Sequence, residues 1–312
     1  MRIGISRCLL GDRVRYDGGH KRVSFLVDVL GRYVEWVPVC PEVEAGLGVP
    51  RPPMQLTGSL PHPRLTVIES GDDRTGLLTT FAARRVDELG RIDLAGYVFK
   101  RHSPSCGIER VPVYNRAGTP RPRGVGLFAR ACMDAFPLLP VEDEGRLADP
   151  EILDGFLVRV FAYHRWRGLL KKTVARRAIV EFHTAHKYLL LAHSRPHHQA
   201  LGRLIAQANR HRPGELAMRY GRLFMEALAV KATVRRHVNV LQHILGFFKA
   251  RLDRQEKAEL LNVIDEYRHG LTPLIVPLTL VKHYAQVFDV GDILGQVYLN
   301  PHPKELMLRN HV

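Results

Sequence analysis

Three cysteines stand beside turn-forming residues at distant points of the chain. Cys8 precedes Leu-Leu-Gly-Asp, Cys40 precedes Pro-Glu, and Cys106 follows Ser-Pro-Ser. Because Pro and Gly hold tight turns that expose backbone N–H groups, these thiols lack the surroundings of core cysteines. Soft metals prefer thiolate ligands, so three thiols meeting at one place would suit a 4Fe-4S cluster or zinc. The competing chemistry is a single nucleophilic cysteine with His20 or His102 as its base.

Charged and polar residues cluster in the same loops. The segment 11–21 combines an acidic residue, a Gly-Gly turn, a histidine and a lysine, and such a loop is able to wrap a nucleotide or phosphate. Glu42 lies two residues after Cys40, where the alternative role is that of a helix-start carboxylate. Basic residues upstream of Cys106 would lower thiolate pKa values and attract phosphate. The substrate-binding candidates are Asp17, His20, Lys21, Arg51, Lys100 and Arg101.

The first part of the chain alternates strand and helix patterns. We expect strands at 2–10, 33–39, 64–70 and 94–100 and helices at 23–32, 75–90 and 126–136, followed by an apolar segment at 137–141. This alternation predicts an α/β domain, Rossmann-like, with a mostly parallel sheet and flanking helices. Ligands bind outside the carboxyl ends of strands in such sheets, and the three turn cysteines follow predicted strands.

Helical patterns follow one another from residue 147 without strands between them. Apolar residues recur at i, i+3 and i+4 in 147–170, 174–194, 197–209, 214–230, 234–252 and 254–270. The sequence therefore predicts an all-α bundle of about six helices. The acidic segment 142–145 is the expected joint, which gives a first domain of residues 1–145 and a second of residues 146–312.

The charge is concentrated in the second part. The chain has 46 Lys and Arg against 31 Asp and Glu, a balance of +15. Residues 1–145 hold 20 basic and 17 acidic side chains, and residues 146–312 hold 26 and 14, which gives +3 and +12. An excess of this size on one domain is typical of a surface that neutralises phosphates.

The remaining composition indicates a reducing compartment. The cysteines are widely separated, form no C-x-x-C pair, and are not preceded by a secretory leader, so we expect a cytoplasmic protein without disulfides. Cys132 lies within the apolar helical pattern of 126–136 and is expected in the core. No run of about 18 apolar residues occurs, so we expect no transmembrane segment and no membrane partner.

Three long motifs, taken in order, resemble the thiouracil desulfidase family. They are ISRCLLGDRVRYDGGHK, VCPEVEAGLGVPRPP and FKRHSPSCG, and the match spans about residues 1–145. The basic helical part resembles the partner domain of a fused subgroup that removes sulfur from 4-thiouridine in transfer RNA. One position departs from the family pattern, because Ala45 and Gly46 stand where relatives carry Gly-Gly.

The resemblance implies a role for each matched residue. Cys8, Cys40 and Cys106 would ligate a 4Fe-4S cluster whose fourth iron, free of protein, would bind the C4 sulfur of the thiolated base and act as a Lewis acid. Glu42 would be the general acid/base, and Ser103 would position water or substrate. The net reaction would be hydrolytic.

The helical domain would then hold the RNA by shape and charge, and the thiolated base would be extruded from its stack. No obligate protein partner is expected. Candidate phosphate contacts are Arg165, Arg167, Lys171, Lys172, Arg176 and Arg177, with Arg235 and Arg236 further along.

Two alternatives stay open at this point. The protein could desulfurise free thiouracil or its nucleotides, with the helical part serving oligomerisation. It could also be a non-catalytic RNA-binding or regulatory protein in which a cluster or zinc is structural.

Overall fold

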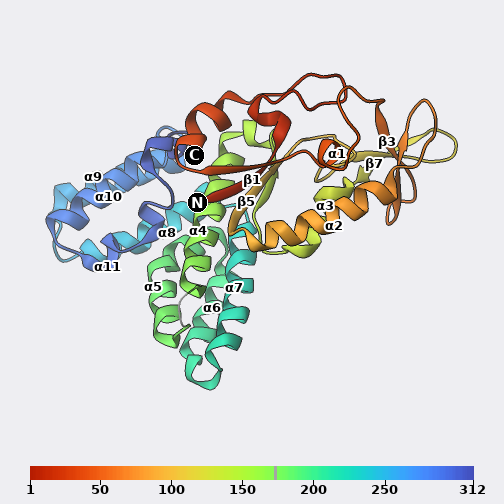
Figure 1. Ribbon diagram of the computed structural model, residues 1–312. Helices are drawn as coiled ribbons and strands as arrows, with labels where there is room; N and C mark the ends of the chain where they lie inside the picture. Colours follow the sequence, from red (N-terminus) through yellow and green to blue (C-terminus); the bar gives the residue numbers. More distant parts are fainter. Residues whose placement is uncertain (172–173) are drawn as a thin grey trace. The chain divides into compact units, whose positions relative to one another are not determined.

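The chain folds into two compact units. The computed structural model describes residues 1–171 and 174–312 (Figure 1). The first unit is Met1–Ala148 and the second is Asp149–Val312, a division three residues beyond the expected boundary at 145.

A parallel four-stranded sheet forms the centre of the first unit. Its strand order is β2-β1-β5-β8, and every neighbouring pair is parallel. The chain runs from β1 to β2 on one side and returns to β5 on the other side of β1. Such a reversal of winding opens a crevice at the carboxyl ends of the strands. The bounds are β1 (Arg2–Ser6), β2 (Glu35–Val39), β5 (Leu94–Phe99) and β8 (Val141–Asp143).

Aromatic packing fixes this sheet to its helices. The rings of Tyr97 and Phe99, both on the fully buried strand β5, stack with centroids 3.9 Å apart. Phe128, on helix α3 (Leu127–Ala135), contacts both rings edge-on, with its ring centroid 6.2 Å from that of Tyr97 and 6.3 Å from that of Phe99. Helix α2 (Thr75–Arg91) adds Phe81, 6.3 Å from Phe128. The sheet edge is therefore a rigid base for the loops that follow its strands.

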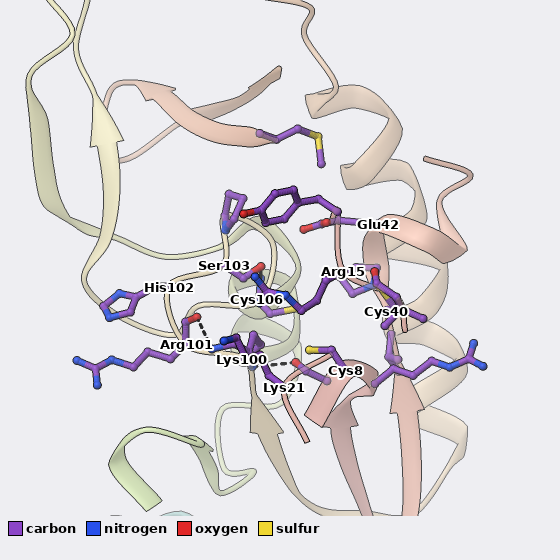
Figure 2. A pocket seen from close by; sticks show the side chains of 18 of the residues that line it. Cys8, Arg15, Lys21, Cys40, Glu42, Lys100, Arg101, His102, Ser103 and Cys106 are labelled. Carbon is purple, nitrogen blue, oxygen red and sulfur yellow. Dashed lines mark hydrogen bonds between the residues drawn. The ribbon is translucent and has the colours of Figure 1, made fainter. Parts of the chain in front are cut away.

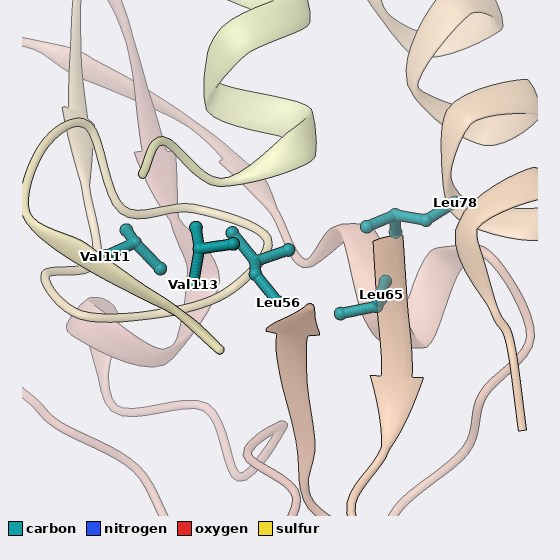
Figure 3. Packing of buried hydrophobic residues seen from close by; sticks show 5 residues of the cluster. All are labelled: Leu56, Leu65, Leu78, Val111 and Val113. Carbon is teal, nitrogen blue, oxygen red and sulfur yellow. The ribbon is translucent and has the colours of Figure 1, made fainter. Parts of the chain in front are cut away.

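A second sheet was not expected from the sequence. Its order is β4-β3-β6-β7, with antiparallel pairs at both ends and a parallel pair in the middle. The predicted strand at 64–70 belongs here, as the antiparallel partner of β3, so its assignment to the parallel sheet was wrong. The core between this sheet and α2 is formed by Leu56, Leu65, Leu78, Val111 and Val113 (Figure 3). The bounds are β3 (Met54–Gly58), β4 (Pro63–Val67), β6 (Val111–Tyr114) and β7 (Pro120–Gly124).

Several predicted bounds in the first unit need correction. The strand expected at 2–10 ends at Ser6, and a 3-10 turn, Arg7–Leu10, follows. The helix expected at 23–32 is a π-helical turn, Phe25–Val29, continued by a 3-10 turn, Leu30–Arg32. The expected joint at 142–145 begins inside strand β8, because parallel pairing with β5 extends to Asp143.

In its described residues the second unit consists of helices and short 3-10 turns. Its helices include α10 and the short α11, beyond the six expected, and the helix expected at 234–252 ends at Leu245. Trp166, Phe182, Tyr220 and Phe224 form its aromatic core. None of the helices in the described residues is both long and apolar enough to cross a bilayer. The bounds are α4 (Pro150–Leu170), α5 (Arg176–His193), α6 (Arg195–Ala206), α7 (Pro213–Ala229), α8 (Val234–Leu245), α9 (Arg254–Arg268), α10 (Ile275–Val287) and α11 (Gly291–Leu294).

Candidate functional site

A cavity of about 430 Å³ in the first unit is lined by Cys8, Cys40 and Cys106. The three cysteines follow β1, β2 and β5, and the cavity therefore lies at the carboxyl ends of the parallel strands. Figure 2 shows the labelled cysteines around one space, with Glu42 on one side of it. Residues 98 positions apart in the sequence thus meet at the edge where the winding of the sheet reverses.

The first turn fixes Cys8 through its own carbonyl oxygen. The Cys8 carbonyl accepts hydrogen bonds from the N–H of Gly11, at 3.3 Å, and of Lys21, at 2.9 Å. Gly11 has φ +106, a left-handed conformation that glycine adopts without strain. The loop between these residues therefore folds back, and Lys21 joins Cys8 in the cavity wall.

The second turn places Cys40 immediately before the short helix α1 (Pro41–Glu44). The Cys40 N–H donates to Glu44 Oε1 at 2.8 Å, and the Cys40 thiol lies 3.7 Å from the Val14 carbonyl oxygen. Ala45 has φ −78, an ordinary right-handed value, and Gly46 has φ +92. The alanine that departs from the family pattern therefore stands where no glycine is required.

The third turn holds Cys106 against the start of helix α3. Ser103 Oγ accepts hydrogen bonds from the N–H of Ser105, at 3.2 Å, and of Cys106, at 3.1 Å. The first N–H groups of α3, which have no partner within the helix, donate to carbonyls of this turn: Gly126 to Gly107 at 2.7 Å and Phe128 to Ser105 at 3.0 Å. The helix start thus fixes the backbone on both sides of Cys106.

Burial raises the pKa of each thiol in the cavity. For Cys8 the pKa rises to about 11, although Lys100 acts in the opposite direction. Burial also raises the pKa of Cys40, although hydrogen bonds from the Val43 and Glu42 N–H groups lower it in part. The pKa of the buried Cys106 thiol lies well above its ordinary value. In the described residues no histidine is hydrogen-bonded to these thiols, and His20 Nδ1 accepts from the Arg22 N–H at 3.2 Å. The single-nucleophile alternative is therefore disfavoured.

The donor set of the cavity is thiol-rich. Three cysteines and one carboxylate, Glu42, line it, and thiolates are preferred by iron–sulfur clusters and other soft centres. Within residues 1–171 and 174–312, no three His, Cys, Asp or Glu side chains are gathered closely enough to hold a metal ion. The residues present fit a thiophilic group by their chemistry.

Glu42 is held by two residues. Ser105 Oγ donates to Glu42 Oε1 at 2.7 Å, and Arg51 Nε donates to Glu42 Oε2 at 2.9 Å, with Arg51 Nη2 forming a second, shorter bond to the same oxygen. Ser105 is fully buried, and sequence reasoning missed it. Its only signal was its place beside Cys106, because the partner lies 63 residues away.

The cationic candidates divide into paired and open side chains. Lys100 Nζ pairs with Glu144, and Arg51 pairs with Glu42. The side chains of Lys21 and Arg101 line the cavity and form no hydrogen bond or ion pair in the part of the chain that the structure describes. In Figure 2 the Arg101 side chain extends away from the thiols.

Asp17 and His20 lie outside the cavity wall. Asp17 Oδ1 instead accepts the Gly19 N–H at 2.9 Å, which lowers the Asp17 pKa and closes a local turn. Cys132 is also outside the cavity, 1% exposed within α3, where burial raises its pKa to about 12.

The phosphate contacts predicted in the second unit are differently placed. Arg165 Nη2 donates to the Pro301 carbonyl at 2.6 Å, and burial lowers the Arg165 pKa. Arg176 donates to the His211 carbonyl at 2.7 and 2.9 Å, and Arg177 pairs with Glu181 at 2.7 Å. Arg167 and Lys171 each have an interaction with another residue, and Lys172 lies outside the described residues.

A cavity at the edge of a parallel sheet, with three cysteines and one fixed carboxylate, defines a thiol-rich ligand site of an α/β protein. Residues 3–144 match the family model described as 2-thiouracil desulfurase, and residues 187–303 match one described as a protein of unknown function (DUF1722). The chain belongs to the 2-thiouracil desulfurase family, with a DUF1722 region following the desulfurase domain.

Two relatives and one solved structure are similar to parts of the chain. The uncharacterized protein YbgA of Escherichia coli K12 is 32% identical over 158 residues, which cover 50% of this chain and 94% of YbgA. The uncharacterized protein YbbK of Bacillus subtilis 168 is 32% identical over 111 residues, 33% of this chain and 71% of YbbK. The structure of the [4Fe-4S]-dependent thiouracil desulfidase TudS is 32% identical, covers 47% of this chain and 93% of its own, and has a TM-score of 0.40.

Proposed function

We propose that this protein is an iron–sulfur-dependent desulfidase that removes sulfur from 4-thiouridine in tRNA. The observation that carries the proposal is the meeting of Cys8, Cys40 and Cys106 in one cavity beside the fixed carboxylate of Glu42. The reaction consumes one water, breaks the C4–S bond, forms a C4–O bond, and gives uridine and hydrosulfide. No electrons are transferred to or from the base.

The three cysteines would hold a 4Fe-4S cluster with one iron free of protein ligands. When bound, the cluster would supply a Lewis acid that polarises the thiocarbonyl group. Such a cluster and four free cysteines suit a reducing compartment, and we place the protein in the cytoplasm.

Glu42 would move the proton in this reaction. Its carboxylate lines the cavity with a side chain 13% exposed, within reach of water and of a bound base. Ser103 also lines the cavity, and its oxygen accepts two backbone N–H groups, so its hydroxyl hydrogen is directed to a different acceptor. Ser103 would therefore orient water or substrate by donating that hydrogen.

A phosphate-bearing substrate fits the open cations of the cavity wall. The side chains of Lys21 and Arg101 have no hydrogen-bond or ion-pair partner among the described residues, and a phosphate would receive charge-assisted hydrogen bonds from both. The Arg101 side chain extends away from the thiols, as the phosphate of a nucleotide would lie away from its base (Figure 2). We therefore favour a nucleotide unit over the bare base as substrate.

The second unit offers a surface for the rest of an RNA. Two adjoining grooves share Arg235 and Asn239 and are lined also by Arg195, Arg236 and Arg268, with no acidic residue in either wall. Elsewhere on the unit, arginines are often neutralised by glutamates one helical turn away, as in Arg177–Glu181, Arg219–Glu215 and Arg222–Glu226. Arginines without carboxylate partners are available to neutralise the phosphates of an RNA.

Anaerobic incubation of cluster-loaded protein with thiolated tRNA tests the proposal. Mass analysis of the nucleosides is expected to find 4-thiouridine replaced by uridine, with hydrosulfide released, and no conversion by Cys106→Ala. Retained 4-thiouridine with the loaded protein would count against it. Replacing Arg235 or Arg268 by alanine should weaken tRNA binding and lower its salt-dependence slope by about 1 for each contact.

A second candidate substrate is a free thiouracil nucleotide. The cavity volume of about 430 Å³ is in the range of small-molecule sites, so a nucleotide would fit without the second unit. Equal kcat/KM for thio-UMP and thiolated tRNA, unchanged by the arginine replacements, would favour this candidate. A colourless protein that contains zinc and shows no turnover would favour the third alternative, a non-catalytic RNA-binding or regulatory protein.

A further inference from the structure

We propose that Arg51 and Ser105 are positioning residues that fix the Glu42 carboxylate, and that Arg51 takes no part in binding substrate phosphate. The inference rests on the proposed function, in which Glu42 moves the proton. It assigns a different task to Arg51, which the sequence placed among the substrate-binding candidates. Ser105 and Arg51 hold opposite oxygens of one carboxylate.

The donors of Arg51 are fully used by protein. A guanidinium group has five N–H bonds in a fixed planar arrangement. Nε and Nη2 donate to Glu42 Oε2, Nη1 and Nη2 donate to the Val14 carbonyl at 3.1 Å each, and Nη1 donates to the Gly48 carbonyl at 2.8 Å. All five donors are therefore engaged, and a substrate phosphate would have to displace one of these acceptors.

The acceptor sites of Glu42 identify the oxygen that is free to react. An ionised carboxylate has about four lone-pair sites, two on each oxygen. Oε2 accepts two hydrogen bonds from Arg51, whereas Oε1 accepts one, from Ser105 at 2.7 Å. Oε1 is therefore the oxygen with capacity left to accept a proton from water or to return one to the base.

Burial makes this arrangement rigid. The side chains of Arg51 and Glu42 are 5% and 13% exposed, and Ser105 is fully buried. A planar guanidinium can satisfy one carboxylate oxygen and two carbonyls together, whereas a lysine ammonium donates from a single point. Arg51→Lys would retain the charge but lose the geometry, and the carboxylate would be free to turn about its last torsion.

Comparison of substrates separates positioning from phosphate binding. For Arg51→Lys we expect kcat to fall by about 100-fold, the usual cost of a small misplacement. The factor should be the same for thiouracil, thio-UMP and thiolated tRNA, with KM nearly unchanged. Free guanidinium ion should restore part of the kcat of Arg51→Ala. A rise in KM confined to the two phosphate-bearing substrates would overturn the inference.

Arg64→Lys is the matched control. Arg64 Nε and Nη2 both donate to Asp73 Oδ2, the same two-to-one arrangement, but on an exposed hairpin outside the cavity. We expect this variant to behave as the wild type in kcat and KM. Iron content should be measured in each variant, because a loss of iron parallel to the loss of kcat would overturn positioning in favour of a purely structural role.

Binding of UMP, measured by calorimetry, gives a readout that does not depend on turnover. UMP has no sulfur to remove, so this measurement stands even if the protein proves not to be a desulfidase. We expect Arg51→Lys to keep the wild-type affinity for UMP and Arg101→Ala to lose about tenfold. Equal losses in both variants would make Arg51 a phosphate ligand and overturn the inference.

Ser105→Ala and Ser105→Thr test the other half of the arrangement. The alanine removes the donor to Glu42 Oε1, and kcat should fall for all three substrates. The threonine keeps a hydroxyl and should recover part of that loss. If Ser105→Ala retains the wild-type kcat at full iron content, Ser105 has no positioning role.

Discussion

Replacing Gly126 by alanine should displace the Cys106 turn without altering any reacting group. The backbone of Gly126 has φ −61 and ψ 145, which alanine adopts freely, so the effect is steric alone. A Cβ atom at this position would lie 2.5 Å from the Ser105 carbonyl carbon, 2.6 Å from its oxygen and 2.8 Å from the Cys106 nitrogen. All three are backbone atoms, which cannot rotate aside as a side chain can.

The size of the effect follows from these distances. Non-bonded carbon atoms prefer separations of about 3.5–4.0 Å, so the turn must move by about 1 Å. Overpacking of this kind costs about 1–3 kcal/mol, and a displacement of about 1 Å in a reacting geometry lowers the rate about 100-fold. We therefore expect Gly126→Ala to melt several degrees lower, to bind less iron and to lose most of its kcat.

The assay is iron per protein, visible absorption of the reconstituted cluster and thermal unfolding, measured side by side. Gly76→Ala is the control, because Gly76 lies in helix α2 with no atom within 4 Å of an added Cβ. That variant should keep its iron and be as stable as the wild type or more so. A Gly126→Ala protein with wild-type iron content, melting temperature and kcat would refute the close packing of helix α3 on the Cys106 turn.

Further predictions concern the remaining buried thiol, the ligand set and acid stability. Cys132→Ser buries a hydroxyl and should lower the stability of the fold while the iron content stays unchanged. Cys106→Ser should instead lose iron, and an equal loss of iron in both variants would contradict the ligand assignment. Burial lowers the pKa of His186 and of His193 to about 4 and that of His237 to about 3. Because unfolding restores an ordinary pKa near 6.5, stability should be full above that pH and fall as the pH drops toward 4, by up to about 3 kcal/mol for each buried imidazole. Thermal unfolding from pH 8 to 4 checks this, and His186→Gln should flatten the fall.

The cysteine motifs allowed the position of the cavity to be predicted, because each thiol follows a strand of apolar residues and the ends of parallel strands meet. Strands β3, β6 and β7 gave no such signal. Strand β7 reads Pro-Arg-Pro-Arg-Gly and is exposed except at Gly124, and β6 contains Pro112, so neither has the alternating apolar pattern of a strand. They are stabilised by pairing with each other and with β3, a contact that local composition does not encode.

Residue roles were harder to predict than positions. Arg51 is a basic residue near a predicted site, and only the fold shows that two protein carbonyls and a carboxylate use its donors. Periodicity identifies the apolar face of a helix but does not say which charged residue on the other face has a partner. The sequence alone therefore does not distinguish the arginines around helix α8, whose grooves contain no acidic residue, from those that pair with glutamates.

The contacts of Glu42 and Arg51 extend beyond the two residues to all three cysteine-bearing segments. Ser105, in the turn of Cys106, donates to Glu42, which itself lies in the turn of Cys40. Arg51 donates to the carbonyl of Val14, in the loop that follows Cys8. The group that we expect to move the proton is thus part of the network that sets the spacing of the thiols. A side chain that must be fixed relative to a three-cysteine site is best attached to the loops that carry those cysteines, because any shift of one loop then moves the carboxylate with it.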